Sequence, residues 1–304
     1  MIQKIILKIR SSYSFLKQER EIRRSIDIDI SDIKTICLVF GPYRNLSSLS
    51  AVMAVLHPNC QVLNHAQRRI LPHKKVNFFM RYSETRFNSF IKYAIHLSLS
   101  GKRGLVGGSV LHSHAFDKLD VKEKYKNRFG DKLLKEKINC LFWKEGLHLQ
   151  NHFLENNINT IDLIKKNKKI VFILPIRNPL DCAMSNQNTG MSNIFHKINP
   201  NSTYQEILKS ILDDFLLFFN YQKQLSSNFF HYYQHSFNES TLKGFCNYLD
   251  LPFDERWKND VLDIYNIKES YPHKKEDIDF YEEYISTNFK DFPDEMEKLL
   301  QFIK

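Results

Sequence analysis

The residues best suited to chemistry begin where an apolar run meets a turn, in FGPYRNLSSLSAVM, residues 40–53. Backbone N–H groups at such a turn and at the following helix start point toward a bound oxyanion, and the helix dipole favours negative charge there. An arginine and paired hydroxyls add further hydrogen-bond donors. The sequence therefore predicts an anion-binding loop made of Gly41, Pro42, Tyr43, Arg44, Asn45, Leu46, Ser47 and Ser48.

A second candidate anion site lies in KIVFILPIRNPLDCAMSNQ, residues 169–187. Arg177 follows an apolar run of strand length, and Ser185 comes eight residues later in the next predicted helix. In open parallel sheets, ligands bind outside the carboxyl ends of the strands. We therefore expect Arg177 and Ser185 to face a second anion at the same sheet edge as the first loop.

A nucleoside-triphosphate hydrolase or kinase would need a different loop. The phosphate-binding motif GxxxxGK[ST] requires glycine and lysine before the hydroxyl. Leu46 and Ser47 stand at those two positions, and no magnesium-holding aspartate is evident at a strand end. This disfavours a magnesium-dependent ATP-binding enzyme, which stays as an alternative.

Regular elements must hold these two segments in place. Continuous apolar runs recur and are separated by stretches with helical spacing, which indicates strands covered on both faces. We expect an α/β fold with a central parallel sheet flanked by helices, a three-layer sandwich similar to that of the P-loop NTPases. The expected strands are 34–40, 60–63, 104–110, 138–143, 169–176 and 228–233.

Three helix starts can be predicted from capping residues. Ser47 and Ser48 open a helix that ends near Pro58, and Asn178 with Pro179 forms a cap and first turn. Ser202 with Gln205 resembles a capping box that opens a long helix to about Leu225. Its core face is expected to comprise Ile207, Leu208, Ile211, Leu212 and Phe215.

Taken together, the two anion segments resemble the 5'-phosphosulfate loop and the 3'-phosphate motif of sulfotransferases that use 3'-phosphoadenosine 5'-phosphosulfate (PAPS). The resemblance extends from about residue 34 to 253, with a later strand, helix and Leu-Pro pattern at 228–253. It implies that Arg44, Ser47 and Ser48 face the 5'-phosphosulfate and that Arg177 and Ser185 face the 3'-phosphate. It also implies a hydroxyl acceptor, by default a carbohydrate, and no metal ion.

Two departures from the family pattern concern the donor. Leu46 stands where the family usually has glycine, so this loop must reach its anion without glycine's freedom in φ. The family's C-terminal basic-glycine motif is missing, and Lys274 and Lys275 are either its substitute or a solvated pair.

A base should remove the acceptor proton. His65 follows the second expected strand, at a position similar to the catalytic Glu of some Golgi-type family members, and a histidine suits this task near neutral pH. Lys144 follows another strand and resembles a family lysine, or lysine–acidic pair, near the acceptor, so it is a candidate for stabilising charge or positioning substrate. The competing histidines are His57, His148 and, as reserve candidates, His112 and His114.

Composition restricts the class of protein further. The formal net charge of +10 favours an anionic partner, but the basic residues are dispersed, which disfavours nucleic acid. Five scattered cysteines without a CxxC pair suggest free thiols, a reducing compartment and a cytoplasmic location. We expect residues 1–30 to form a basic helical segment, able at most to touch an anionic membrane surface, and 31–304 to form one α/β domain with a helical C-terminal part.

A sulfotransferase is thus the favoured interpretation. A magnesium-dependent kinase or NTPase is one alternative, and a non-catalytic nucleotide- or polysaccharide-binding protein is the other. The first class should bind 3'-phosphoadenosine 5'-phosphate (PAP) without metal, the second should bind ATP with magnesium, and the third should show no turnover.

Overall fold

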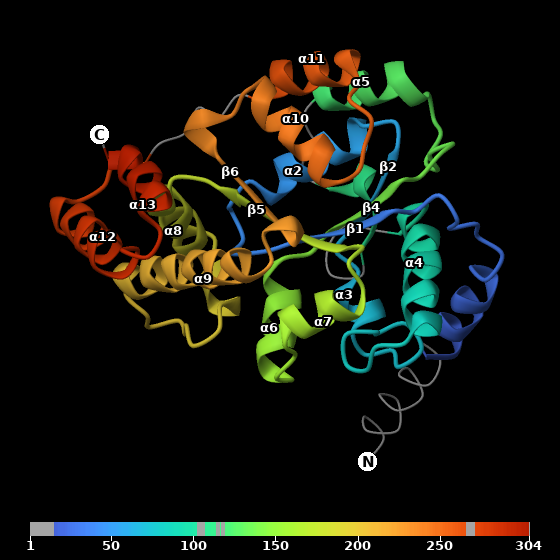
Figure 1. Ribbon diagram of the computed structural model, residues 1–304, viewed down its shortest axis with the longest axis horizontal. Helices are drawn as coiled ribbons and strands as arrows, with labels where there is room; N and C mark the ends of the chain where they lie inside the picture. Colours follow the sequence, from blue (N-terminus) through green and yellow to red (C-terminus); the bar gives the residue numbers. More distant parts are fainter. Residues whose placement is uncertain (1–14, 102–106, 114–115, 117–118, 266–270, 304) are drawn as a thin grey trace.

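The computed structural model describes residues 15–101, 107–113, 116, 119–265 and 271–303, and these ranges contain a six-stranded sheet in the order β3-β2-β4-β1-β5-β6 (Figure 1). Neighbouring strands are parallel except for β2 and β3. The expected α/β fold is confirmed. The strands are β1 (Thr35–Val39), β2 (Cys60–Asn64), β3 (Gly108–Ser109), β4 (Cys140–Lys144), β5 (Ile170–Ile176) and β6 (Phe229–Tyr233).

The expected strand 104–110 needs correction. Only Gly108–Ser109 pairs, and it runs antiparallel to β2 at the sheet edge. Gly108 has a φ of +141° and lies against the backbone of residue 100 and of Gly101, which explains why a glycine is needed in this short edge strand. Residues 102–106 lie outside the described ranges.

Both faces of the sheet are covered, as continuous apolar strands predict. Successive residues of a strand point to opposite faces, so Ile36 and Leu38 of β1 enter one core while Cys37 and Val39 enter the other. Helices α2 (Ser47–Leu56), α5 (Leu119–Phe129), α10 (Glu239–Tyr248) and α11 (Glu255–Ile264) cover one face (Figure 1). The predicted three-layer arrangement is therefore present.

The other face carries the larger core. It packs against α3 (Gln67–Ile70), α4 (Glu84–Ser98), α6 (Leu147–Glu155), α7 (Thr160–Lys166), α8 (Pro179–Asn188) and α9 (Tyr204–Gln224). Helices α12 (Lys275–Asn288) and α13 (Pro293–Leu300) pack beside α8 and α9 beyond β6 (Figure 1). The C-terminal helices thus lie against the part of the chain that carries the second predicted anion motif.

The predicted helix starts are correct for α8 and displaced for α9. Asn178 caps α8, since its side chain accepts a hydrogen bond from the N–H of Leu180 at 3.0 Å. The capping box of α9 is formed by Thr203 and Glu206, one residue beyond the predicted Ser202 and Gln205. The five expected core residues of α9 are all buried.

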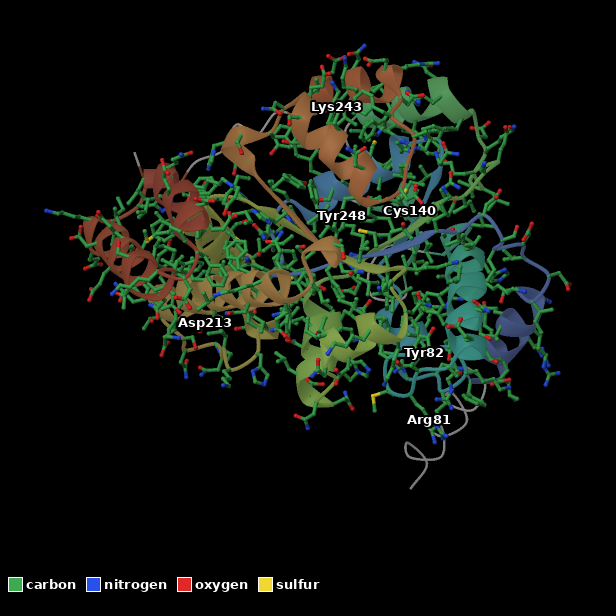
Figure 2. All side chains as sticks on the ribbon, in the orientation of Figure 1. Arg81, Tyr82, Cys140, Asp213, Lys243 and Tyr248 are labelled. Atoms are coloured by element: carbon green, nitrogen blue, oxygen red, sulfur yellow. The ribbon has the colours of Figure 1, made fainter. Side chains whose placement is uncertain are left out.

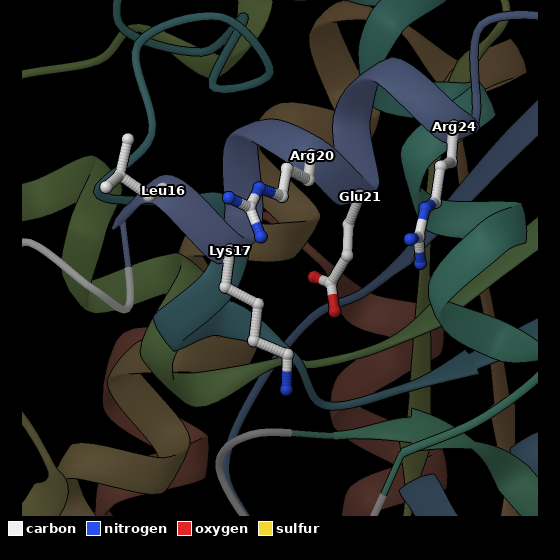
Figure 3. A pocket seen from close by; sticks show the side chains of 5 residues that line it. All are labelled: Leu16, Lys17, Arg20, Glu21 and Arg24. Atoms are coloured by element: carbon white, nitrogen blue, oxygen red, sulfur yellow. The ribbon is translucent and has the colours of Figure 1, made fainter.

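A helix over residues 15–24 precedes the sheet, and its Ile22 packs into the larger core. Among the described residues, Leu16, Lys17, Arg20, Glu21 and Arg24 of this helix line a surface hollow of about 190 Å³ (Figure 3). None of them belongs to the predicted donor site. Within the described ranges, no helix combines the length and apolar character needed to cross a bilayer.

Candidate active site

The four predicted chemical segments meet at one edge of the sheet. Strands β1, β5, β4 and β2 are parallel, so their carboxyl ends at Val39, Ile176, Lys144 and Asn64 share that edge. The predicted anion-binding loop, residues 41–48 and called the donor loop below, follows β1. Arg177 follows β5, His65 follows β2, and Lys144 ends β4. The structure therefore brings Arg44, His65, Lys144 and Arg177 to the same side of the molecule.

The donor loop achieves its shape through left-handed backbone conformations. Gly41 has a φ of 91°, and a Cβ there would lie 2.7 Å from Cδ1 of Leu174. Arg44 and Leu46 have φ values of 60° and 59°. Leu46 thus adopts the left-handed conformation at the position where the family prefers glycine, at a cost of about 1 kcal/mol.

The helix that follows presents its N-terminus without a side-chain cap. Leu46 occupies the N-cap position and, having no side-chain acceptor, makes no capping hydrogen bond, and no acidic residue lies in the first turn of α2. Ser47 and Ser48 are partly exposed, and Arg44 is exposed. This end of α2 can therefore donate its N–H groups and hydroxyls to an anion.

A buried asparagine ties the two predicted anion sites together. Oδ1 of Asn45 accepts a hydrogen bond from the backbone N–H of Arg177 at 2.9 Å, and Asn45 is 1% exposed. From α8, Nδ2 of Asn186 donates to the Tyr43 carbonyl at 2.7 Å. The loop after β1 is thus bonded to the residue that follows β5 and to the last turn of α8, which fixes the spacing of these segments.

The second anion motif is enclosed by acidic and C-terminal groups. Arg177 and Ser185 are both buried, and a guanidinium nitrogen of Arg177 lies 3.8 Å from a carboxylate oxygen of Asp181. The Asp181 carboxylate also accepts from Nε2 of His273 at 3.0 Å. The ring of Tyr271 lies beneath the Arg177 guanidinium, with its centroid 5.9 Å from Cζ.

These contacts show which C-terminal residues reach this motif. Lys274 is largely exposed, and its Nζ lies 3.3 Å from a carboxylate oxygen of Glu276. Lys275, which begins α12, is also exposed. Tyr271 and His273 approach Arg177 instead, and no sequence signal identified them because the contact depends on tertiary packing.

His65 is held by a buried carboxylate. Its Nδ1 lies 2.9 Å from Oε2 of Glu145, whose side chain is 0% exposed, while 23% of the His65 side chain is exposed. The other oxygen of Glu145 accepts a hydrogen bond from the Tyr43 hydroxyl at 3.1 Å. Glu145 was not among the predicted site residues, although it follows Lys144 directly in the sequence.

The competing histidines are placed differently. His57 lies at the amino end of β2, where its Nε2 is 2.9 Å from the Pro252 carbonyl, and burial lowers its pKa to about 4. His148 packs edge-on against Tyr43. His112 lies in the short helix after β3, and His114 lies outside the described residues.

Lys144 is buried at the end of β4, the strand that lies between β1 and β2 in the sheet. Its Nζ lies 3.4 Å from Oδ1 of Asn64. Burial lowers the pKa of Lys144 to about 8; the charge of Glu145 opposes this shift and that of Arg44 reinforces it. Because Arg44 acts on this pKa, the two cationic groups share one electrostatic environment.

The lowered pKa of Lys144 predicts a pH-dependent contribution to stability. Between pH 8 and 10.5 the unfolded chain retains this proton and the folded protein does not, so stability rises with pH. We expect the unfolding free energy of wild type, relative to Lys144→Met, to increase by on the order of 1 kcal/mol per pH unit in this range. Urea unfolding at several pH values measures it.

The matched control is Lys243→Met, because Lys243 is exposed on α10 (Figure 2). The difference in unfolding free energy between wild type and Lys243→Met should not change over the same pH range. If the difference in unfolding free energy between wild type and Lys144→Met is the same at every pH, the lowered pKa of Lys144 is contradicted.

The turns after β1 and β4 approach each other closely. A Cβ on Gly146 would lie 2.9 Å from the carbonyl oxygen of Gly41. Oε1 of Gln150 accepts a hydrogen bond from the N–H of Gly41 at 3.3 Å, and Nε2 of Gln150 donates to the carboxylate of Asp214. That carboxylate is buried, and burial raises the pKa of Asp214 to about 7. The donor loop therefore rests on α6 and α9 as well as on α8.

The described residues hold no cluster of three or more His, Cys, Asp or Glu side chains spaced to bind a metal ion. All five cysteines are buried, free thiols. The site is thus built from cations, hydroxyls, backbone N–H groups and two histidine–carboxylate pairs, His65–Glu145 and His273–Asp181.

Fold and site together define an α/β protein with two adjoining anion motifs and a histidine at one sheet edge. No protein-family model and no curated protein matches the sequence. Two solved structures are similar in fold. The sulfotransferase domain from the Synechococcus PCC 7002 olefin synthase has 12% identity and a TM-score of 0.38, with 82% of this chain and 94% of that chain covered.

The second is the sulfotransferase STF9 from Mycobacterium avium, with 12% identity and a TM-score of 0.42, covering 90% of this chain and 80% of that chain. Both of these proteins are described as sulfotransferases.

Proposed function

We propose that this protein transfers a sulfuryl group from PAPS to a hydroxyl acceptor. The observation that supports this most is the hydrogen bond from the backbone N–H of Arg177 to Asn45, which joins the loop after β1 to the residue that follows β5. A donor with anions at both its 5' and 3' positions matches such a pair. Arg44, Ser47 and Ser48 would face the phosphosulfate end, and Arg177 with Ser185 the 3'-phosphate.

The chemistry would be an in-line displacement at sulfur. A bond forms between the acceptor oxygen and sulfur while the bond from sulfur to the bridging oxygen of the nucleotide breaks. Negative charge grows on that bridging oxygen, where Arg44 and the uncapped N-terminus of α2 would stabilise it. His65 would take the acceptor proton, and Lys144 would stabilise charge beside it.

The acceptor is proposed to be a carbohydrate, because the sequence motifs resemble those of glycan-modifying sulfotransferases. Transfer without a metal ion is part of the same proposal, since a sulfuryl group carries less negative charge than a phosphoryl group. Five free thiols support a reducing, cytoplasmic compartment.

Ligand-induced thermal stabilisation tests this function against the kinase alternative. PAP at 100 times its Kd should stabilise the fold by about 2.7 kcal/mol, which raises the Tm by several degrees in the absence of metal. AMP, which lacks the 3'-phosphate, should give a much smaller shift. Stabilisation by ATP with magnesium and none by PAP would point to a kinase or NTPase instead.

Transfer of label from radioactive PAPS to a panel of glycans tests turnover. Labelled product is expected for at least one glycan. PAP binding without transfer to glycan, lipid or peptide acceptors would indicate the non-catalytic binding alternative.

A further inference from the structure

One fully buried carboxylate, that of Glu145, joins the donor loop to the histidine. Its Oε2 lies 2.9 Å from Nδ1 of His65, and its Oε1 accepts from the Tyr43 hydroxyl at 3.1 Å. The two oxygens therefore serve two different segments, the turn after β2 and the loop after β1. A buried carboxylate that makes two such hydrogen bonds holds both partners in place.

The Tyr43 contact has a fixed direction. Burial, together with the charge of Glu145, raises the pKa of the Tyr43 hydroxyl far above its ordinary value, so the hydroxyl keeps its proton and donates. Tyr43 is adjacent to Arg44, and its own carbonyl accepts from Asn186 of α8. A change in the loop at Arg44 is thus transmitted to the Glu145 carboxylate through one hydrogen bond.

The His65 backbone is also fixed. Its φ is 55°, its N–H donates to the Lys144 carbonyl at 3.2 Å, and its carbonyl accepts from the indole N–H of Trp143. With the backbone held, the orientation of the ring depends on the bond at Nδ1. An ionised carboxylate only accepts hydrogen bonds, so Nδ1 must carry the proton.

This arrangement leaves Nε2 as the basic nitrogen. Nε2 of His65 has no hydrogen-bond partner in the part of the chain that the structure describes, and the side chain is partly exposed. The charged and titratable groups around the pair are Glu145, Lys144, Arg44 and Tyr43, with His148 packed on the last. Glu145 is the acidic member of this group, so its charge offsets the two cations.

We propose that Glu145 is a positioning residue that fixes the Nδ1–H tautomer of His65 and, through Tyr43, couples the orientation of His65 to the donor loop. The catalytic part of this inference rests on the proposed sulfotransferase function. The tautomer and the hydrogen bonds do not, and they can be measured without turnover.

Glu145→Gln is the main test. If the amide oxygen keeps accepting from the Tyr43 hydroxyl, as Oε1 of Glu145 does, the NH2 group of the introduced glutamine donates to Nδ1 and moves the ring proton to Nε2, while the shape of the side chain is kept. Replacing an orienting carboxylate by its amide lowers kcat by about 10⁴-fold in a comparable histidine–carboxylate pair. We expect a loss of kcat on the order of 10³-fold or more, with PAP affinity within about twofold of wild type.

The tautomer of His65 distinguishes a positioning role from a purely structural one. If Glu145 only supported the fold, replacing it would not change which ring nitrogen carries the proton. Nitrogen-15 NMR of histidine-labelled protein, assigned with His65→Gln, should show Nδ1–H in wild type and Nε2–H in Glu145→Gln. Tyr43→Phe is the matched variant, because it removes the other hydrogen bond and leaves the His65 contact. It should keep the Nδ1–H tautomer and lose less than about tenfold in kcat, with weaker PAP binding.

The outcomes separate the two proposals. If PAP does not bind, the sulfotransferase function fails whatever the tautomer is. If PAP binds and sulfate is transferred, an Nε2–H tautomer in wild type, or a Glu145→Gln protein with wild-type kcat, overturns the positioning role. If Glu145→Gln does not fold, the wild-type NMR spectrum still tests the positioning role, because it shows which ring nitrogen of His65 carries the proton.

Discussion

Replacing Arg44 by methionine should lower kcat by about 10²–10³-fold, which corresponds to about 2.7–4 kcal/mol of transition-state stabilisation. Arg44 is exposed in the donor loop, next to the N-terminus of α2 and within electrostatic reach of Lys144. Charge on the bridging oxygen grows only as the bond to sulfur breaks, so a cation placed there affects kcat more than binding. PAP affinity should fall by less than about tenfold.

The matched control for this variant is Arg256→Met. Arg256 is also exposed, and it lies on α11, where a guanidinium nitrogen donates to the Asn127 carbonyl at 3.3 Å. This substitution should leave kcat and PAP affinity unchanged. Equal losses in both variants, or a large loss of PAP affinity with kcat preserved in Arg44→Met, would contradict the role assigned to Arg44. Initial rates at saturating PAPS and calorimetric titration with PAP give both quantities.

Replacing Arg177 by methionine should produce the opposite pattern. A buried hydrogen bond between charged groups contributes about 1.5–3 kcal/mol, so PAP affinity should fall by about 10–100-fold. The rate at saturating donor should change little, because the 3'-phosphate takes no part in bond breaking. Isothermal titration with PAP measures the affinity.

The control for Arg177→Met is a change of ligand from PAP to AMP. AMP lacks the 3'-phosphate, so wild type and Arg177→Met should bind it with similar affinities. Arg177 lies 3.8 Å from Asp181, and its removal leaves that carboxylate paired with His273, which limits damage to the fold. An equal loss of affinity for PAP and for AMP would show that Arg177 supports the site in general and does not recognise the 3'-phosphate.

The strands of the sheet could be predicted because each is a short apolar run between turn residues. β5 (Ile170–Ile176) is buried along its whole length, and its sequence IVFILPI has no polar residue that would suggest another element. The exception was β3, since two residues, Gly108 and Ser109, pair only because β2 offers its edge. Neither strand length nor antiparallel direction is encoded in such a short segment.

The displaced capping box of α9 shows how local signals compete. Ser202 and Thr203 are both suitable N-caps, and each has a Gln or Glu three residues later. The Ser202 hydroxyl instead accepts a hydrogen bond from the N–H of Asn199 at 3.2 Å, and Thr203 forms the capping box with Glu206. The preceding turn therefore engages one of two equivalent caps and leaves the other to begin the helix.

The positions of the principal cations and of the histidine could be predicted from one general rule. Arg44, His65, Lys144 and Arg177 each come at or just after the carboxyl end of a strand, and parallel strands bring those ends together. The supporting groups could not be predicted in the same way. Glu145, Tyr271 and His273 gain their roles from contacts 80 to 102 residues apart in sequence, as in the bonds from Glu145 to His65 and to Tyr43 and from Asp181 to His273.

The close approach at Gly146 has a consequence for anyone who wishes to redesign the acceptor specificity. A single methyl group there would lie 2.9 Å from the Gly41 carbonyl and push the β1 turn away from the β4 turn. Libraries that diversify the exposed surroundings of His65 should therefore hold this glycine constant, since even alanine at 146 would displace the loop after β1 in which Arg44 lies.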